Sequence, residues 1–194
     1  MPRLTRQNLL SLEQYAEQRD AIRREVMAHK KLRRVPIGDH LALYFEDETT
    51  MRYQVQEMLR IEKLFEPAEI EGELSAYNPL IPDGSNWKAT VMIEYPDEVE
   101  RRRRLAELKG IENSVHIRIE GFDPVYAIVN EDMERSTDDK TSSVHFARFE
   151  FTTEMIHAMK SGAAITAGVR HDAYPHDPVQ ITGVVRASLL SDLT

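Results

Sequence analysis

The sequence predicts an α+β protein, with one mainly antiparallel sheet of about six strands built from two β-α-β-β units and N-terminal helices packed on it. Residues 1–82 have mostly helical apolar periodicity, whereas residues 83–194 mostly alternate apolar and polar positions. A proline-rich segment separates the two parts. We interpret them as regions of one compact domain, because 194 residues suit one substantial core.

The N-terminal part, residues 1–82, is predicted to be helical with one short strand. The expected elements are a helix at 5–32 capped by Thr5, a strand at 41–45, and helices at 51–65 and 67–77. Residues 78–84 (Asn-Pro-Leu-Ile-Pro-Asp-Gly) then interrupt regular structure, because proline fixes φ and lacks an amide donor. This segment marks the boundary between the two parts.

The C-terminal part, residues 83–194, is predicted to repeat the order strand, helix, strand, strand. The expected strands are 88–95, 115–119, 124–129, 143–151, 164–169 and 179–185, with helices at 96–109 and 152–161. The final strand opens with Asp123-Pro124-Val125 in the first unit and Asp177-Pro178-Val179 in the second. Residues 88–129 and 143–185 are therefore candidates for an internal repeat. The alternative is chance similarity between two common units.

The composition argues against several classes of function. The net charge of −8 does not favour nucleic acid as the main partner, because phosphate backbones select basic surfaces. No apolar stretch approaches the roughly 18 residues of a membrane helix, so we expect no membrane association. Without cysteine there is no thiolate metal site and no cysteine nucleophile. The N-terminus lacks the apolar core of a signal peptide, which favours a cytoplasmic location.

One basic stripe is predicted on the first helix. Arg23, Lys30 and Arg34 are separated by seven and four residues, so they share one helical face. The stripe is either a docking or anion-binding face, or the solvated side of a long helix. The sequence does not distinguish these alternatives.

Histidine and carboxylate side chains are the remaining candidates for chemistry, since no phosphate loop, nucleophile elbow or HExxH motif is present. The densest group is the hairpin 171–177, His-Asp-Ala-Tyr-Pro-His-Asp. Its imidazoles and carboxylates suit zinc, iron or manganese, with His171 as the candidate ligand. The alternative is an ordinary polar turn.

Two further polar side chains are predicted on apolar faces. His145 alternates with Ala147 and Phe149, which predicts a buried imidazole, whereas His116 is expected at the surface. Glu57 shares a helical face with Gln54 and Ile61 and is expected to point inwards. An inward carboxylate needs a partner, either an arginine such as Arg33 or a metal ion shared with His145.

Short segments spread along the chain support a family resemblance. They are Ala28–Arg34, Phe45-Glu46, Tyr53–Met58, Tyr77–Pro82, Lys88–Thr90, His145-Phe146 and Phe149. On these segments the chain resembles the bacterial domain-of-unknown-function 3501 family over nearly its whole length. The resemblance directs attention to His29, Arg33, Arg34, Glu46, Gln54, Glu57, Asn78 and His145. It also implies a role beside redox or peroxide metabolism, through neighbouring rubrerythrin-like and iron–sulfur oxidoreductase genes.

Two functional hypotheses follow. The first is an accessory or binding protein that docks on a redox protein partner through the Arg23–Arg34 face or the proline-rich segment. The alternative is an enzyme that binds a metal or small anion between the helical and sheet parts. Its cofactor would be a divalent transition metal, and a homodimer is the oligomeric candidate. Candidate binding residues are Arg33, Arg34, Gln54, Glu57, Asn78 and His145; candidate metal ligands are Glu57, His145 and His171.

Overall fold

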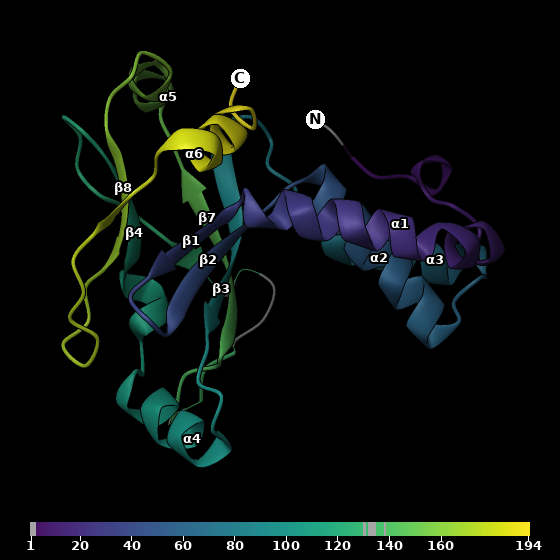
Figure 1. The fold of residues 1–194 in the computed structure, drawn as a ribbon, viewed down its shortest axis with the longest axis horizontal. Helices are drawn as coiled ribbons and strands as arrows, with labels where there is room; N and C mark the ends of the chain where they lie inside the picture. Colours follow the sequence, from purple (N-terminus) through teal and green to yellow (C-terminus); the bar gives the residue numbers. More distant parts are fainter. Residues whose placement is uncertain (1–2, 130, 132–134, 138) are drawn as a thin grey trace.

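Two antiparallel sheets form the centre of the molecule, and three helices extend from them to one side (Figure 1). The computed structural model describes residues 3–129, 131, 135–137 and 139–194. The predicted α+β class is confirmed. The prediction of one sheet of about six strands is corrected, because the described residues form nine strands in two sheets.

The helical part consists of α1 (Leu12–Lys31), α2 (Glu48–Glu62) and α3 (Pro67–Tyr77), with short 3-10 turns η1 (Arg6–Asn8) and η2 (Asn78–Leu80). Ser11, not Thr5, caps α1, because its side chain accepts from the amide of Gln14. The helices share a small core of their own. It contains Leu4, Met51, Val55, Leu59, Leu74 and Ile81. They pack mainly on one another, α2 also contacts β2, and together they extend to one side of the sheets (Figure 1).

Sheet A has the strand order β1 (Arg34–Ile37), β2 (Leu41–Glu46), β3 (Asn86–Ile93), β7 (Val144–Glu150) and β6 (Ile128–Val129). Sheet B has the order β5 (Val125–Tyr126), β4 (Val115–Ile119), β8 (Ile165–Val169) and β9 (Val179–Gln180). The predicted strand at 124–129 is divided at Ala127. Its first half joins sheet B and its second half joins sheet A.

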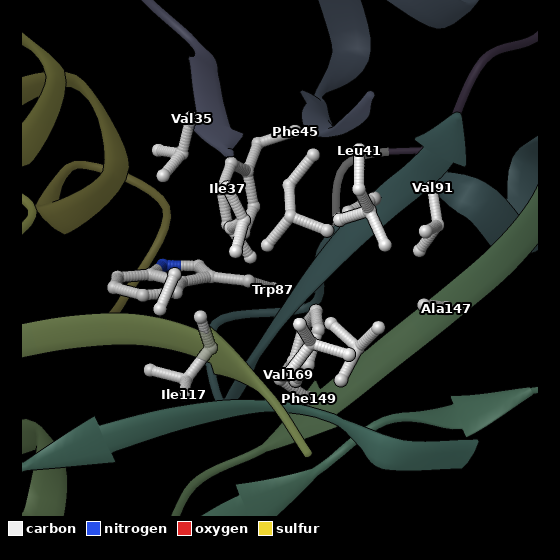
Figure 2. Close-up of a cluster of buried hydrophobic side chains, with 14 of the residues drawn as sticks. Val35, Ile37, Leu41, Phe45, Trp87, Val91, Ile117, Ala147, Phe149 and Val169 are labelled. Atoms are coloured by element: carbon white, nitrogen blue, oxygen red, sulfur yellow. The ribbon is translucent and has the colours of Figure 1, made fainter. Parts of the chain in front are cut away.

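The main core lies between the two sheets, because their strands turn alternate side chains towards each other. Trp87 of β3, Phe149 of β7 and Ile117 of β4 have no exposed surface and meet there (Figure 2). The indole of Trp87 packs edge-on against Phe45 and Phe151. These inward positions leave the other side of each strand available for polar groups.

Three shorter helices complete the fold, namely α4 (Glu98–Glu107), α5 (Thr153–Lys160) and α6 (Gly183–Leu190), with the turn η3 (Ile111–Ser114). The predicted strand at 179–185 is mostly wrong: β9 ends at Gln180 and α6 begins at Gly183. None of the helices in the described part of the chain is long and apolar enough to cross a membrane.

The two predicted units have the same element order, β3-α4-β4-β5 and β7-α5-β8-β9. Their first strands, β3 and β7, pair with each other in sheet A, and β4 pairs with β8 in sheet B. All these pairings are antiparallel, so the two units face each other across both sheets. An ancestral duplication of residues 88–129 and 143–185 stays a prediction.

Candidate functional site

The buried side chain of Arg33 bonds to residues from both the N-terminal and the C-terminal part of the chain. Its Nε donates to the carbonyl of Phe45 at 3.1 Å, and Nη2 donates to the carbonyl of Glu46 at 3.2 Å. Nη1 donates to the carbonyl and hydroxyl of Ser188, and Nη2 donates to the carboxylate of Asp192. With an exposed fraction of 1%, Arg33 is saturated by the protein itself and has no donor left for a ligand.

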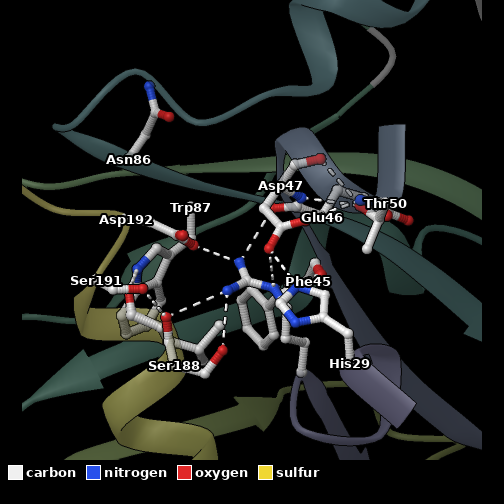
Figure 3. A network of polar contacts seen from close by, with 12 residues as sticks. His29, Phe45, Glu46, Asp47, Thr50, Asn86, Trp87, Ser188, Ser191 and Asp192 are labelled. Atoms are coloured by element: carbon white, nitrogen blue, oxygen red, sulfur yellow. Dashed lines mark hydrogen bonds and ion pairs between the residues drawn. The ribbon is translucent and has the colours of Figure 1, made fainter. Parts of the chain in front are cut away.

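The Arg33 cluster also includes the start of α2. Asp47 lies 3.4 Å from Nε of Arg33, and its carboxylate is 2.5 Å from Nε2 of His29. Ser188 and Asp192 approach from one side, and Asp47 and His29 from the other (Figure 3). The predicted pairing of Arg33 with Glu57 is therefore wrong. Arg33 bonds to the ends of β2 and α6 instead.

Glu57 belongs to a separate network between α1 and α2. Both carboxylate oxygens accept from Arg19, at 2.7 and 2.8 Å, and the hydroxyl of Tyr15 donates at 2.8 Å. The Arg19 guanidinium is the main reason that the pKa of Glu57 falls from 4.5 to about 2. Of the two predicted alternatives, pairing with an arginine is the one observed, but the partner is Arg19 and not Arg33.

His145 is fully buried on β7 at the end of the interior between the sheets. Its Nε2 lies 2.9 Å from Oγ1 of Thr141 and 3.1 Å from the carbonyl of Ser142. Thr141 also donates to the buried Glu112 at 2.8 Å, which places that carboxylate 3.9 Å from Nε2. His145 is thus buried as predicted, within a local polar network of η3 and the residues preceding β7.

The candidate metal ligands Glu57, His145 and His171 do not share a site. Nε2 of His171 lies 3.1 Å from the carbonyl of Lys109, apart from both networks above. Within the described ranges, no three His, Cys, Asp or Glu side chains are grouped as metal ligands. A metal bound jointly by these three residues is not supported by their positions.

The other candidate residues have structural partners. Asn78 accepts from the Leu4 amide at 2.8 Å and donates to its carbonyl at 3.0 Å, which fixes the N-terminal segment against η2. Arg34 donates to the Tyr44 hydroxyl and to Glu94. In the described structure Gln54 makes no side-chain hydrogen bond.

The face predicted for Gln54, Glu57 and Ile61 is also corrected. Ile61 is 59% exposed, so this face does not point into a core as a whole. The neighbouring Gln56 is the buried amide, accepting from the Leu10 amide at 2.6 Å. Gln56 lies on the opposite side of α2, so the buried amide of this helix is not on the predicted face.

A cleft of about 720 Å³ lies where the helical part meets the outer face of sheet A. The proline-rich segment, predicted as the boundary of the two parts, forms one of its edges. Its apolar lining is Met58, Ala76, Tyr77, Pro79, Leu80, Phe146 and Ala147, and its polar lining is Glu73, Ser75, Asp83, Asn86, Lys88, Glu131 and Arg148. A concave apolar surface with a few polar groups is typical of small-molecule sites.

Lys88 lies in this cleft on the outer face of β3. The register of sheet A places it directly between Glu46 of β2 and Arg148 of β7. Like charges directly opposite each other on paired strands are unfavourable. Burial, followed by the charge of Arg148, lowers the pKa of Lys88. Within the described chain its ammonium group has no hydrogen bond or ion pair.

Carboxylates surround Lys88 but bind elsewhere. Arg148 is held by Glu131 at 2.8 and 3.0 Å and by Glu150 at 2.6 Å. Asp83 accepts from the amide and hydroxyl of Ser85, and these hydrogen bonds outweigh burial and lower its pKa. The cleft is therefore not a cationic surface, although it contains a lysine without a hydrogen bond or ion pair to the described residues.

Glu73 of α3 lies in the lining opposite to the sheet. Burial, with a smaller contribution from Glu62, raises the pKa of its carboxyl group. It forms no ion pair with the described residues. Two titratable groups with shifted pKa values, Lys88 and Glu73, thus line the same cleft, a combination that is enriched at functional sites.

The sequence alone does not single out Lys88 or Glu73 as site residues. Alternation places Lys88 on the outer face of its strand, where lysine is ordinarily solvated. The only sequence signal was the Lys88–Thr90 segment of the family resemblance. The pairing of β3 with β7, which places Arg148 opposite, is visible only in the fold.

Comparison with known proteins identifies the family. A family model described as "Protein of unknown function (DUF3501)" matches residues 3–193. The chain belongs to the DUF3501 family. The predicted resemblance is thereby confirmed. The chain is also similar to a crystal structure described as a novel protein of unknown function from Burkholderia pseudomallei K96243, with 52% identity over 100% of both chains and a TM-score of 0.94. No curated protein matches.

Proposed function

We propose that this DUF3501 protein binds a small organic molecule in the cleft between the helical part and sheet A. The observation that supports this most directly is Lys88, a half-buried residue whose ammonium group has three donors and no acceptor among the described residues. Its partial desolvation lowers the pKa of the ammonium group. A ligand oxygen that accepts from Lys88 would offset part of that desolvation.

The lining defines the class of ligand. Phe146, Tyr77 and Leu80 provide surface for an apolar body, while Lys88 provides one donor position. The neighbouring carboxylates disfavour a strongly anionic molecule. The proposed ligand is therefore uncharged, with an apolar ring or chain and one carbonyl oxygen. The enzyme hypothesis located its site between the same two parts, but no histidine is among the described residues that line this cleft.

The test uses cyclohexanone, acetophenone and benzamide as uncharged carbonyl probes, with benzoate as the anionic comparison. Binding is followed by amide chemical shifts in ¹H–¹⁵N spectra. We expect shifts at Ala76, Phe146 and Arg148, and weaker binding of benzoate than of benzamide. Lys88→Met should weaken the best probe at least tenfold, because the donor assigned to the ligand oxygen is lost.

The matched control is Lys160→Met, which removes an exposed lysine on α5 that does not line the cleft. It should leave probe affinity within twofold of the wild type. Equal affinity of the Lys88→Met and Lys160→Met proteins, or shifts confined to other surfaces, would refute the proposed site.

The accessory role beside a redox protein partner stays a prediction. The stripe proposed for docking is only partly available, since Arg34 bonds to Tyr44 and Glu94, whereas Arg23 and Lys30 have no polar partner in the described chain. A pull-down with the wild type and a triple charge-reversal variant of the stripe tests it. Unchanged recovery of every partner would count against docking there. The cytoplasmic location and the homodimer also stay predictions.

A further inference from the structure

The outer face of sheet B carries a second groove, of about 560 Å³. Register places His116 of β4 opposite Gly168 of β8, and Arg118 opposite Thr166. These four positions face outwards, whereas the intervening Ile117 is fully buried in the core. The groove belongs to β4, β8 and the hairpins that flank them, and does not share a lining residue with the cleft on sheet A.

A glycine allows the His116 ring to lie along the sheet. A Cβ atom at Gly168 would lie 2.8 Å from Nε2 of His116, too close for any other residue without movement of the ring. His116 was predicted at the surface. It is on the outer face, but it is only 5% exposed because it fills the space above Gly168.

The tautomer of His116 follows from its hydrogen bond. Nδ1 lies 3.2 Å from the carbonyl oxygen of Ser114, which can only accept, so Nδ1 carries the hydrogen. Nε2 has no hydrogen-bond partner among the described residues and lines the groove. It accepts when the ring is neutral and donates when the ring is protonated.

A second imidazole is positioned in the same way. His176 lies against Gly38, where an added Cβ would be 2.5 Å from the ring, and its centroid is 4.2 Å from that of Tyr174. His176 also lines the groove. Thus the hairpin with the densest histidine content contributes His176 here, while His171 contacts the Lys109 carbonyl.

The charge of the groove contrasts with the acidity of the whole chain. Arg118 and Arg170 both line it, and neither forms an ion pair with a described carboxylate. Among the described residues, the Arg170 guanidinium donates to the Tyr126 hydroxyl, at 3.3 Å. The single acid in the lining, Glu120, accepts from the Ala164 amide. Both guanidinium groups are therefore available to an anion, although the net charge of the protein is −8.

We propose that this groove binds a phosphate group, either as free phosphate or as part of a small phosphorylated molecule. Arginine forks match phosphate oxygens in geometry and charge. Arg118 and Arg170 provide the charge, and Thr166 and His116 provide hydrogen bonds at the floor. The proposal does not depend on the function proposed for the cleft on sheet A.

The titration of His116 reports whether the groove holds an anion. Burial lowers its pKa, the hydrogen bond to Ser114 raises it, and the charges of Arg170 and Arg118 lower it further. The other titratable groups of the lining are Glu120 and His176, and Tyr126 packs on the ring with centroids 5.4 Å apart. A bound anion favours the imidazolium form, so phosphate should raise the midpoint of the His116 titration.

The test compares sodium phosphate, sodium phenyl phosphate and sodium chloride at equal ionic strength, using the whole chain. Amide shifts should move at residues 116–118 and 166–170 with phosphate and not with chloride. The His116 midpoint, followed by the Cε1 proton, should rise only with phosphate or phenyl phosphate. Tighter binding of phenyl phosphate would support a phosphorylated molecule, and equal binding would support free phosphate.

Two variants distinguish specific phosphate binding in the groove from nonspecific electrostatic attraction of anions. The double variant Arg118→Gln, Arg170→Gln should weaken phosphate at least tenfold. Arg102→Gln removes an exposed arginine of α4 and should change affinity less than twofold. Identical spectra in phosphate and chloride, or equal losses in the double variant and Arg102→Gln, would overturn the proposal.

Discussion

The Glu57 network makes a quantitative prediction about stability. Glu57→Gln removes the charge that Arg19 and Tyr15 bind, while the amide retains a similar shape. Because Arg19 and Tyr15 lie on α1 and Glu57 lies on α2, the change weakens the contact between these helices. We therefore expect the wild type to be the more stable protein at neutral pH.

The magnitude follows from the pKa of Glu57, which falls from 4.5 to about 2. At about 1.4 kcal/mol per pKa unit, the upper limit is about 3 kcal/mol. The side chains of Arg19 and Glu57 are 27% and 12% exposed, so water screens part of the interaction. We expect Glu57→Gln to lower the free energy of unfolding by about 1–2 kcal/mol at pH 7.

The pH dependence has a defined sign. A carboxyl group with a lower pKa in the folded state stabilises the fold above its unfolded pKa, and loses that effect as pH falls through its folded pKa. The difference between wild type and Glu57→Gln should therefore persist from pH 7 to about 5. It should then shrink between about pH 5 and about pH 2.

Urea unfolding at pH 7, 5, 4 and 3 measures this difference. The exposed Glu71→Gln on α3 serves as the control and should change stability by less than about 0.5 kcal/mol. A Glu57→Gln effect below about 0.5 kcal/mol at pH 7, or one that is equal at pH 7 and 3, would refute the reasoning.

Three further substitutions test other parts of the structure by urea unfolding. Arg33→Met leaves the acceptors around a buried guanidinium unpaired, and should cost about 3–5 kcal/mol; a cost below 1 kcal/mol would contradict a structural role. Gly168→Ala forces His116 to move and should cost about 1–3 kcal/mol, whereas Gly72→Ala, in open space on α3, should be neutral or stabilise by up to about 1 kcal/mol. Lys88→Met removes a half-buried charge and should be neutral or stabilising by about 1 kcal/mol; marked destabilisation would make Lys88 a structural group.

Local patterns predicted much of the secondary structure. The strands at 41–46 and 115–119 and the helix at 67–77 lie close to their predicted bounds. The sequence could not show which sheet each strand joins, because alternation identifies an inward face without naming the partner strand. The division of residues 124–129 at Ala127 is decided by pairing with β4 on one side and β7 on the other.

The missed helix α6 has a similar explanation. The run from Val179 to Val185 is rich in β-branched residues, which favour strands. In the fold, the carbonyl of Leu189 accepts from the Trp87 indole, and that of Ser188 accepts from Arg33. These long-range contacts stabilise a helix over residues 183–190 against its local preference.

The sequence predicted those features of the candidate sites that depend on one element, but not those that depend on contacts between elements. Burial of His145 and pairing of Glu57 follow from the periodicity of single elements. Lys88 and Arg118 looked like ordinary surface charges, because their neighbours come from other strands. Each lacks an acidic partner among the described residues. The strands that pair with β3 and β4 decide this, so it is visible only in the tertiary structure.

The Arg33 cluster has a consequence for synthesis of the chain. Ser188 and Asp192, which bind the guanidinium, are made 155 and 159 residues after it. During translation Arg33 and the indole of Trp87 therefore lack their final partners until α6 emerges from the ribosome. The strands of the two sheets can pair before that point, but the contacts of Arg33 and Trp87 with α6 form only after the last helix has been made. Premature release of the nascent chain would leave Arg33 without Ser188 and Asp192 and Trp87 without Leu189, which makes shortened products good substrates for cellular quality control.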